Sequence, residues 1–143
     1  MLDPGHPNVL VGGKRPAHTL MPVLAHRDGR LAAVSGSMGG GGQPQINAMS
    51  ILRAFDLGLE VGEVLAAPRW LVGGMELHAG RTVEVEARVP TSVVGALAEA
   101  GFEPTILEPF DEGVGHAHLI RVASDGSFEV ATDPRADGAV AVS

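Results

Sequence analysis

A run of glycines carries the clearest chemical signal in this sequence. Residues 36–45 read Gly-Ser-Met-Gly-Gly-Gly-Gly-Gln-Pro-Gln, between a strand-like run at 31–34 and a helix-like run at 46–57. Glycine has no Cβ, so a ligand can approach its backbone closely. Peptide N–H groups at the start of a helix have no partner within the helix and favour negative charge. Such a loop can hold a phosphate group or stabilise the oxyanion of an acyl transfer.

The phosphate alternative lacks its usual sequence pattern. The phosphate loop of nucleotide-binding proteins reads Gly-x-x-x-x-Gly-Lys-[Ser/Thr], which does not occur here. Lys14 follows a glycine pair, but the Arg-Pro that comes next does not fit that pattern. The glycines alone leave two main interpretations open, an oxyanion-binding loop and a flexible connection.

His116 and His118 are a second candidate for chemistry. Two positions apart on a strand, their side chains would lie on one face, as in a metal-binding pair. No third ligand stands at a typical spacing, so we favour a structural role and expect no metal site. The sequence has no cysteine, which excludes disulfides, thiolate ligands and a cysteine nucleophile in this chain.

Composition narrows the class of protein further. The chain has 143 residues, is 45% hydrophobic and carries a formal charge of −7, which indicates a folded acidic domain without a nucleic-acid surface. No apolar run reaches the roughly 18 residues of a membrane span. The N-terminal residues have neither the basic start nor the apolar core of a signal peptide, which favours the cytoplasm without fixing the compartment.

Hydrophobic spacing predicts the elements that position these residues. Asp28-Gly29 and Asp125-Gly126 predict hairpin turns, and Gly58 predicts the C′ position of a helix. Thr91 or Ser92 is the expected cap of another helix. Residues 1–17, rich in proline and glycine, predict an extended loop segment. The expected strands are 19–25, 31–34, 69–72, 82–87, 103–107, 116–123 and 128–132, and the expected helices are 46–57, 61–67 and 91–100.

The order of these elements predicts an α+β fold. Hairpins outnumber strand–helix–strand units, so we expect mainly antiparallel strands with helices packed on the sheet. The chain shows no internal repeat and no linker, which predicts a single domain over residues 1–143.

Four short segments, taken in order, resemble a known enzyme family. They are Gly-Lys-Arg-Pro at 13–16 with Pro22, Gly-Ser-Met-Gly-Gly at 36–40, Phe-Asp-Leu-Gly-Leu at 55–59 with Ala-Ala-Pro-Arg at 66–69, and Ala-Thr-Asp-Pro-Arg at 131–135 with Asp137-Gly138. The set resembles the C-terminal part of the small subunit of gamma-glutamyltranspeptidases, which are N-terminal-nucleophile (Ntn) hydrolases. The resemblance implies that the chain forms part of an αββα sandwich.

The resemblance also implies a chemistry. In that family a precursor cleaves itself and exposes a threonine, whose hydroxyl attacks the substrate amide with its own α-amine as base. The acyl group then passes to water or to an amine. The oxyanion hole is thereby assigned to the backbone N–H groups of Gly39 and Gly40. No metal or organic cofactor is implied.

The substrate-binding positions depart from the family pattern. The transpeptidases carry two serines after Lys-Arg-Pro-x, where this chain has His18 and Thr19. Thr19 can still donate a hydrogen bond to a substrate carboxylate, and His18 can be neutral or charged near pH 7. The His-Thr-Leu-Met-Pro and Gly-Gln-Pro-Gln segments resemble the amidohydrolase-like branch of the family.

Asp133, Arg135 and Arg69 are expected to be structural. A carboxylate at Asp133 can cap neighbouring N–H groups and pair with Arg135, as in a turn. We expect Arg69 to be the partner of an ion pair. We expect no nucleophile in this chain, because none of its threonines matches the family's nucleophile segment.

The chain is therefore expected to be the C-terminal portion of a larger gamma-glutamyltransferase-like enzyme and to be inactive alone. Its partners would be a small gamma-glutamyl or related amide substrate, the large subunit and the upstream segment of the small subunit, with homo-oligomerisation left open. The alternatives are a non-catalytic module that binds small carboxylates or anions, and a structural partner of a missing subunit.

Overall fold

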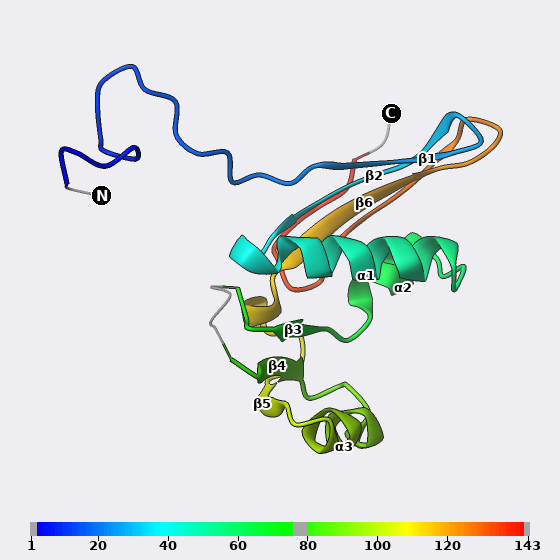
Figure 1. Cartoon of the computed structure of the whole chain (residues 1–143). Helices are drawn as coiled ribbons and strands as arrows, with labels where there is room; N and C mark the ends of the chain where they lie inside the picture. Colours follow the sequence, from blue (N-terminus) through cyan, green and yellow to red (C-terminus); the bar gives the residue numbers. More distant parts are fainter. Residues whose placement is uncertain (1–2, 76–79, 142–143) are drawn as a thin grey trace.

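The computed structural model describes residues 3–75 and 80–141, which form two sheets (Figure 1). Residues 3–22 contain no helix or strand, and their trace runs outside the sheets before it enters the first strand (Figure 1). The strands are β1 (Val23–Arg27), β2 (Arg30–Met38), β3 (Trp70–Val72), β4 (Thr82–Glu86), β5 (Glu103–Leu107), β6 (His116–Val122) and β7 (Phe128–Thr132). The helices are α1 (Gln43–Phe55), α2 (Val61–Ala66) and α3 (Thr91–Glu99), with 3₁₀ turns η1 (Gly40–Gly42) and η2 (Glu112–Val114).

The larger sheet has four strands in the order β1-β2-β6-β7, all antiparallel. Asp28 and Gly29 both have positive φ, 53° and 76°, as a two-residue hairpin turn between β1 and β2 requires. The β6–β7 hairpin turns through Gly126, which has a φ of 87°. Both hairpins are thus confirmed, and they set the register that carries β2 into the glycine loop.

Helices α1 and α2 pack on one face of this sheet (Figure 1). The helices and the inward side chains of the strands share a core without an aromatic residue among its buried members. That core consists of Ala33, Ile46, Ala54, Val61, Val64, Leu65, Leu71, Val114, Ala117 and Leu119. Side chains alternate between the two faces of β2. Ala33 and Ser35 point into the core, and the residues between and beside them point to the opposite face.

The opposite face of the four-stranded sheet, which also carries His116 and His118, exposes large apolar side chains among the described residues. Leu24 of β1 is 62% exposed and Phe128 of β7 is 67% exposed. Met38 at the end of β2 is 45% exposed. A sheet normally buries one apolar face and solvates the other, so an apolar exposed face is the kind of surface that another layer covers.

The smaller sheet has the order β3-β4-β5 and a core of its own. Strand β3 pairs antiparallel with β4, whereas β4 and β5 are parallel and joined through α3. Val83, Val85 and Val89 are buried, with Trp70 and Phe102 packed against them. The sequence predicted mainly antiparallel strands, and this parallel pair, joined through α3, is the exception.

Several expected boundaries are wrong. Helix α1 begins at Gln43, with Pro44 in its first turn, and ends at Phe55, so Gly58 lies one residue beyond C′. The cap of α3 is Pro90, and no side chain of Thr91 or Ser92 caps it. The α+β class with mainly antiparallel strands is confirmed. Within the two described ranges, no helix has the length and apolar character to cross a membrane.

Candidate oxyanion site at the glycine loop

The glycine loop joins the end of β2 to the start of α1 by a tight 3₁₀ turn. Gly39 precedes the turn, and its carbonyl accepts the N–H of Gly42 at 2.8 Å. The N–H of Gly41 donates to the carbonyl of Met75 at 2.7 Å. The loop is therefore held to the connection after β3 and is not a free tether.

Two neighbouring N–H groups of the loop have no partner within the part of the chain that the structure describes. Among residues 3–75 and 80–141, neither Gly39 nor Gly40 donates its backbone N–H to a carbonyl or to a side chain. Gly40 is exposed, while Gly39 is buried. Two adjacent N–H donors on a fixed backbone are the arrangement that stabilises an oxyanion, because they need no reorganisation when the negative charge develops.

The backbone at these positions leaves no room for a side chain. Gly40 has a φ of 50°, and a Cβ there would lie 2.6 Å from the carbonyl oxygen of Met75. A Cβ at Gly39 would meet the side chain of Ile46. Gly115, at the start of β6, has a φ of 68°, and a Cβ there would lie 3.2 Å from the Cα of Gly39. The loop thus needs glycine both for its conformation and for its close packing.

The segment with His18 and Thr19 is tied to the glycine loop from α1. Gln43 donates from its Nε2 to the carbonyl oxygens of Thr19 and Gly40, both at 3.0 Å. Asn47, one turn further along, donates to the carbonyl of Met21 at 3.3 Å. The side chains of His18 and Thr19 are exposed and make no hydrogen bond within the described ranges. The two expected substrate-binding residues and the two expected oxyanion donors thus lie on connected segments.

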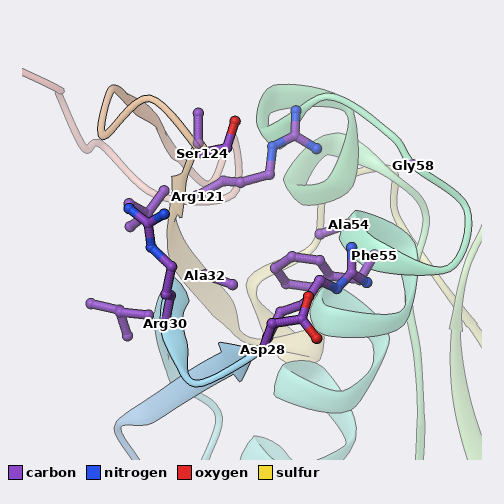
Figure 2. A pocket seen from close by; sticks show the side chains of 12 residues that line it. Asp28, Arg30, Ala32, Ala54, Phe55, Gly58, Arg121 and Ser124 are labelled. Atoms are coloured by element: carbon purple, nitrogen blue, oxygen red, sulfur yellow. The ribbon is translucent and has the colours of Figure 1, made fainter.

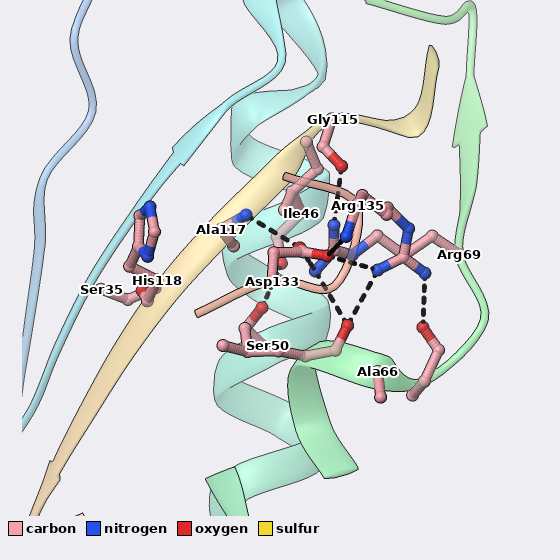
Figure 3. A network of polar contacts seen from close by, with 12 residues as sticks. Ser35, Ile46, Ser50, Ala66, Arg69, Gly115, Ala117, His118, Asp133 and Arg135 are labelled. Carbon is pink, nitrogen blue, oxygen red and sulfur yellow. Dashed lines mark hydrogen bonds and ion pairs between the residues drawn. The ribbon is translucent and has the colours of Figure 1, made fainter. Parts of the chain in front are cut away.

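A buried network of polar contacts gathers around Arg69, Asp133 and Arg135 (Figure 3). Arg135 donates all five of its side-chain N–H groups: two to Glu86, one to Asp133, and two to the carbonyls of Leu65 and Ala67. Asp133 also pairs with Arg69 at 2.5 Å. The side chains of these two acids and two arginines are fully buried. The network joins the large sheet, α2 and the small sheet.

The network also holds the strand that flanks the glycine loop. Arg69 donates from Nη1 to the carbonyl of Gly115 at 2.9 Å, and Asp133 accepts the N–H of Ala117 at 2.9 Å. His116, between them, is the register partner of Met38, the residue before the loop. The buried charges therefore fix the start of β6 against the end of β2.

The surroundings keep both carboxylates ionised. Burial alone would raise the pKa of Asp133, but the charges of Arg69 and Arg135 and two backbone N–H donors hold it below its ordinary value. Burial likewise opposes ionisation of Glu86, yet hydrogen bonds from Arg135 and from the N–H of Arg69 lower its pKa. Burial lowers the pKa of Arg69, and the bonds to Glu86 raise that of Arg135. Arginine nevertheless stays charged at any ordinary pH.

We expect the protein to lose stability in acid. A carboxyl group whose pKa is lower in the folded than in the unfolded state stabilises the fold above its ordinary pKa, and this contribution is lost as the pH falls. For Asp133 and Glu86 the loss should begin near pH 5 and grow down to about pH 2. Urea unfolding at a series of pH values measures it. A free energy of unfolding that stays constant between pH 6 and pH 3 would contradict this expectation.

The histidine pair lies on the same strand face, as expected, beside the end of β2. His116 is half-buried and His118 is exposed, opposite Met38 and Gly36 in the register. No cluster of three or more potential ligands occurs among the described residues. The Ser35 hydroxyl donates to the carbonyl of His118 at 3.2 Å, a contact of the strand backbone.

A cavity of about 650 Å³ opens at the other end of β2, beside the β1–β2 hairpin and the C-terminal end of α1 (Figure 2). Arg27 lies over the ring of Phe55, 5.0 Å from its centre. Arg121 donates to the carbonyl of Leu59 and pairs with Glu129, so a carboxylate of the protein already neutralises its charge. The cavity is lined by the first three residues of β2, so the remaining strand, residues 33–38, separates it from the glycine loop by roughly 20 Å, and it takes no part in that site.

Three residues of the site were missed from the sequence. Glu86 lies in the strand expected at 82–87 and was given no role, yet its side chain is fully buried against Arg135. Gln43 was placed in the loop and is the first residue of α1, where it links Thr19 to Gly40. Gly115 was not distinguished from other turn glycines. Of these three residues, only Gln43 had a signal in the sequence, because it lies in the Gly-Gln-Pro-Gln segment that resembles the amidohydrolase-like branch.

Comparison with known proteins gives a consistent set of relatives. The family model described as Gamma-glutamyltranspeptidase matches residues 1–143. An oxamate amidohydrolase proenzyme from Klebsiella pneumoniae is 40% identical over 98% of this chain and 26% of its own length. A glutathione hydrolase-like proenzyme from Bacillus subtilis is 33% identical over 96% of this chain and 26% of its length. The chain spans about a quarter of the length of these relatives.

Solved structures show the same likeness in three dimensions. The crystal structure of a cephalosporin acylase from Bacillus halodurans has a TM-score of 0.79 to this chain at 32% identity, and the match covers 98% of this chain and 25% of the acylase chain.

Proposed function

We propose, from the premise that the chain belongs to the gamma-glutamyltranspeptidase family, that it supplies the oxyanion-binding loop of an Ntn amidohydrolase. One observation carries the proposal: the adjacent N–H groups of Gly39 and Gly40 have no partner in the described chain, at a fixed junction of strand and helix. The relatives are named as amidohydrolases, glutathione hydrolases and an acylase, which supports cleavage of an amide bond.

The proposed reaction runs through an acyl-enzyme. A threonine hydroxyl from a part of the enzyme outside this chain attacks the amide carbonyl carbon, and its own α-amine accepts the proton. The carbonyl oxygen becomes an oxyanion and accepts hydrogen bonds from the Gly39 and Gly40 N–H groups. The C–N bond then breaks, and the protonated amine returns its proton to the leaving nitrogen. Water, or a second amine, attacks the ester in the same way and releases the acyl group.

The segment that holds His18 and Thr19 would bind the acidic end of the substrate. The Thr19 hydroxyl can donate to a carboxylate, and a ring N–H of His18 can donate a second hydrogen bond. Both side chains are exposed and make no hydrogen bond within the described ranges. The segment that carries them is joined to the loop, because Gln43 donates to the carbonyl of Thr19. We propose that the substrate is an amide that carries a free carboxylate.

The rest of the enzyme would cover the open face of the four-stranded sheet. Leu24, Met38 and Phe128 expose apolar surface on that face, as expected of one layer of an αββα sandwich. A second layer that packs there would carry the nucleophile to the end of β2, where Gly39 begins the loop. The proposal therefore makes the large subunit and the remaining part of the small subunit the partners of this chain.

An amidase assay tests the proposal. We expect a full-length protein that contains this chain to cleave itself and to hydrolyse at least one member of a panel of a gamma-glutamyl anilide and short carboxylate-bearing amides. The 143-residue chain alone should release no product. If the full-length protein is inert while the chain binds carboxylates without turnover, the chain is an anion-binding module and the enzymatic proposal fails.

A further inference from the structure

Gln43 joins the two segments that the proposed function uses. Its side-chain Nε2 donates to the carbonyl oxygen of Thr19 and to that of Gly40, both at 3.0 Å. A primary amide has two N–H donors, so these two bonds use both of them. Two carbonyl acceptors also fix which end of the amide faces them. Gln43 thus forms a direct link between the loop and the segment with His18.

The peptide group between Gly40 and Gly41 is hydrogen-bonded at both its carbonyl oxygen and its N–H. The carbonyl of Gly40 accepts from the side chain and from the backbone N–H of Gln43, and the N–H of Gly41 donates to the carbonyl of Met75 at 2.7 Å. With this peptide fixed, the plane of the preceding one, whose N–H belongs to Gly40, has little freedom. The Oε1 of Gln43 is buried without a hydrogen-bond partner among the described residues, so the side chain is kept there by its two donated bonds.

We propose that Gln43 is a positioning residue that sets the distance between the oxyanion site and Thr19, and that this distance selects the length of the acyl group. The inference rests on the proposed function. A substrate with its reacting carbonyl at Gly39 and Gly40 and its carboxylate at Thr19 must match that distance. The substrate class is then the monoamides of short dicarboxylic acids, discriminated by the number of methylenes between the two carbonyl carbons.

The test compares chain-length preference in the full-length enzyme. The values of kcat/KM are measured for the monoamides of the two-, three-, four- and five-carbon dicarboxylic acids. One methylene typically changes kcat/KM by about 10- to 200-fold when the pocket is rigid. We expect the wild type to show a preference of this size and Gln43→Met to reduce it to below about threefold. The methionine keeps the length of glutamine but donates no hydrogen bond.

Gln45→Met is the matched control. Gln45 lies on the same helix turn, and its side-chain amide also makes two hydrogen bonds. Its Nε2 donates to the carbonyl of Val72 at 3.0 Å, and its Oε1 accepts the backbone N–H of Val72 at 2.9 Å. The Gln45→Met variant should keep the wild-type preference for acyl-chain length even if its stability falls. Gln43→Glu, which nearly preserves the shape and repels both carbonyls, replaces Gln43→Met if that variant does not fold.

The possible results separate the inference from the function beneath it. A flattened preference in the Gln43 variants with an intact one in Gln45→Met supports the inference. A parallel fall of kcat/KM for every amide, with the order and ratios unchanged, overturns it and leaves the proposed function in place. A wild-type enzyme that cleaves none of the four amides, but cleaves the gamma-glutamyl anilide, overturns the substrate class. Inactivity on all of them overturns both proposals.

Discussion

Replacing Asp133 with asparagine is expected to lower the free energy of unfolding by about 3–5 kcal/mol. Asp133 is fully buried between Arg69, at 2.5 Å, and Arg135, at 2.9 Å. It also accepts the N–H groups of Ala117 and Arg135. Asparagine keeps the shape but removes the negative charge. Among the described residues this leaves the buried guanidinium of Arg69 without a carboxylate partner, and that of Arg135 with Glu86 alone. Chemical unfolding followed by circular dichroism measures the loss.

Asp125→Asn provides the matched control for that experiment. Asp125 is an exposed acid that also accepts two local hydrogen bonds, from the N–H of Ser127 at 2.9 Å and its hydroxyl at 2.7 Å. Substitution of an exposed turn residue away from buried charges usually changes stability little, so we expect a much smaller effect than that of Asp133→Asn. Equal small effects of the two substitutions would show that the buried network contributes little to stability.

Gly40→Ala is expected to lower kcat of the full-length enzyme by about 100- to 1000-fold, as the loss of one oxyanion donor does. A Cβ at this position would lie 2.6 Å from the carbonyl of Met75, on a backbone with a φ of 50°. The loop must shift to admit it, and this displaces the N–H groups of Gly39 and Gly40 that we propose as oxyanion donors. We expect KM to change little, because the oxyanion forms only in the transition state.

Gly62→Ala controls for a glycine substitution in itself. Gly62 is exposed in the first turn of α2, and a Cβ there meets no atom within 4 Å. Alanine should stabilise that helix slightly and leave kcat unchanged. The unfolding midpoint of Gly40→Ala, measured beside it, shows whether the variant is folded. A folded Gly40→Ala enzyme with wild-type kcat would remove the loop from the catalytic machinery.

The local signals in the sequence were sufficient for most elements. Strands β5 and β7 have the expected bounds, because alternation and flanking turn residues act over a few positions. The hairpin at Asp28-Gly29 was equally predictable, since its turn needs two positive φ values that few residue pairs adopt. The start of α1 was missed because glycine and proline normally interrupt a helix, whereas here Pro44 occupies the first turn, where its missing N–H costs nothing.

The long-range contacts of the site could not be predicted in the same way. Glu86 looks like the polar side of an exposed strand until Arg135, 49 residues later, is placed against it. The link from Gln43 to Thr19 spans 24 residues and depends on how an irregular segment lies. The roles of Gly39, Gly40, His18 and Thr19 in the reaction came from family resemblance, and they stay predictions.

The residues of the buried charge network lie far apart in the sequence, and this has a consequence for the order of folding. Arg135 bonds to Leu65, 70 residues earlier, and to Glu86. Contacts this distant carry a large loop-closure cost and tend to form late. During synthesis Asp133 cannot fix the strand that flanks the glycine loop until the segment around Asp133 has left the ribosome. The glycine loop would then reach its final geometry only after the segment around Asp133 and Arg135 has been made, however early β2 and α1 form.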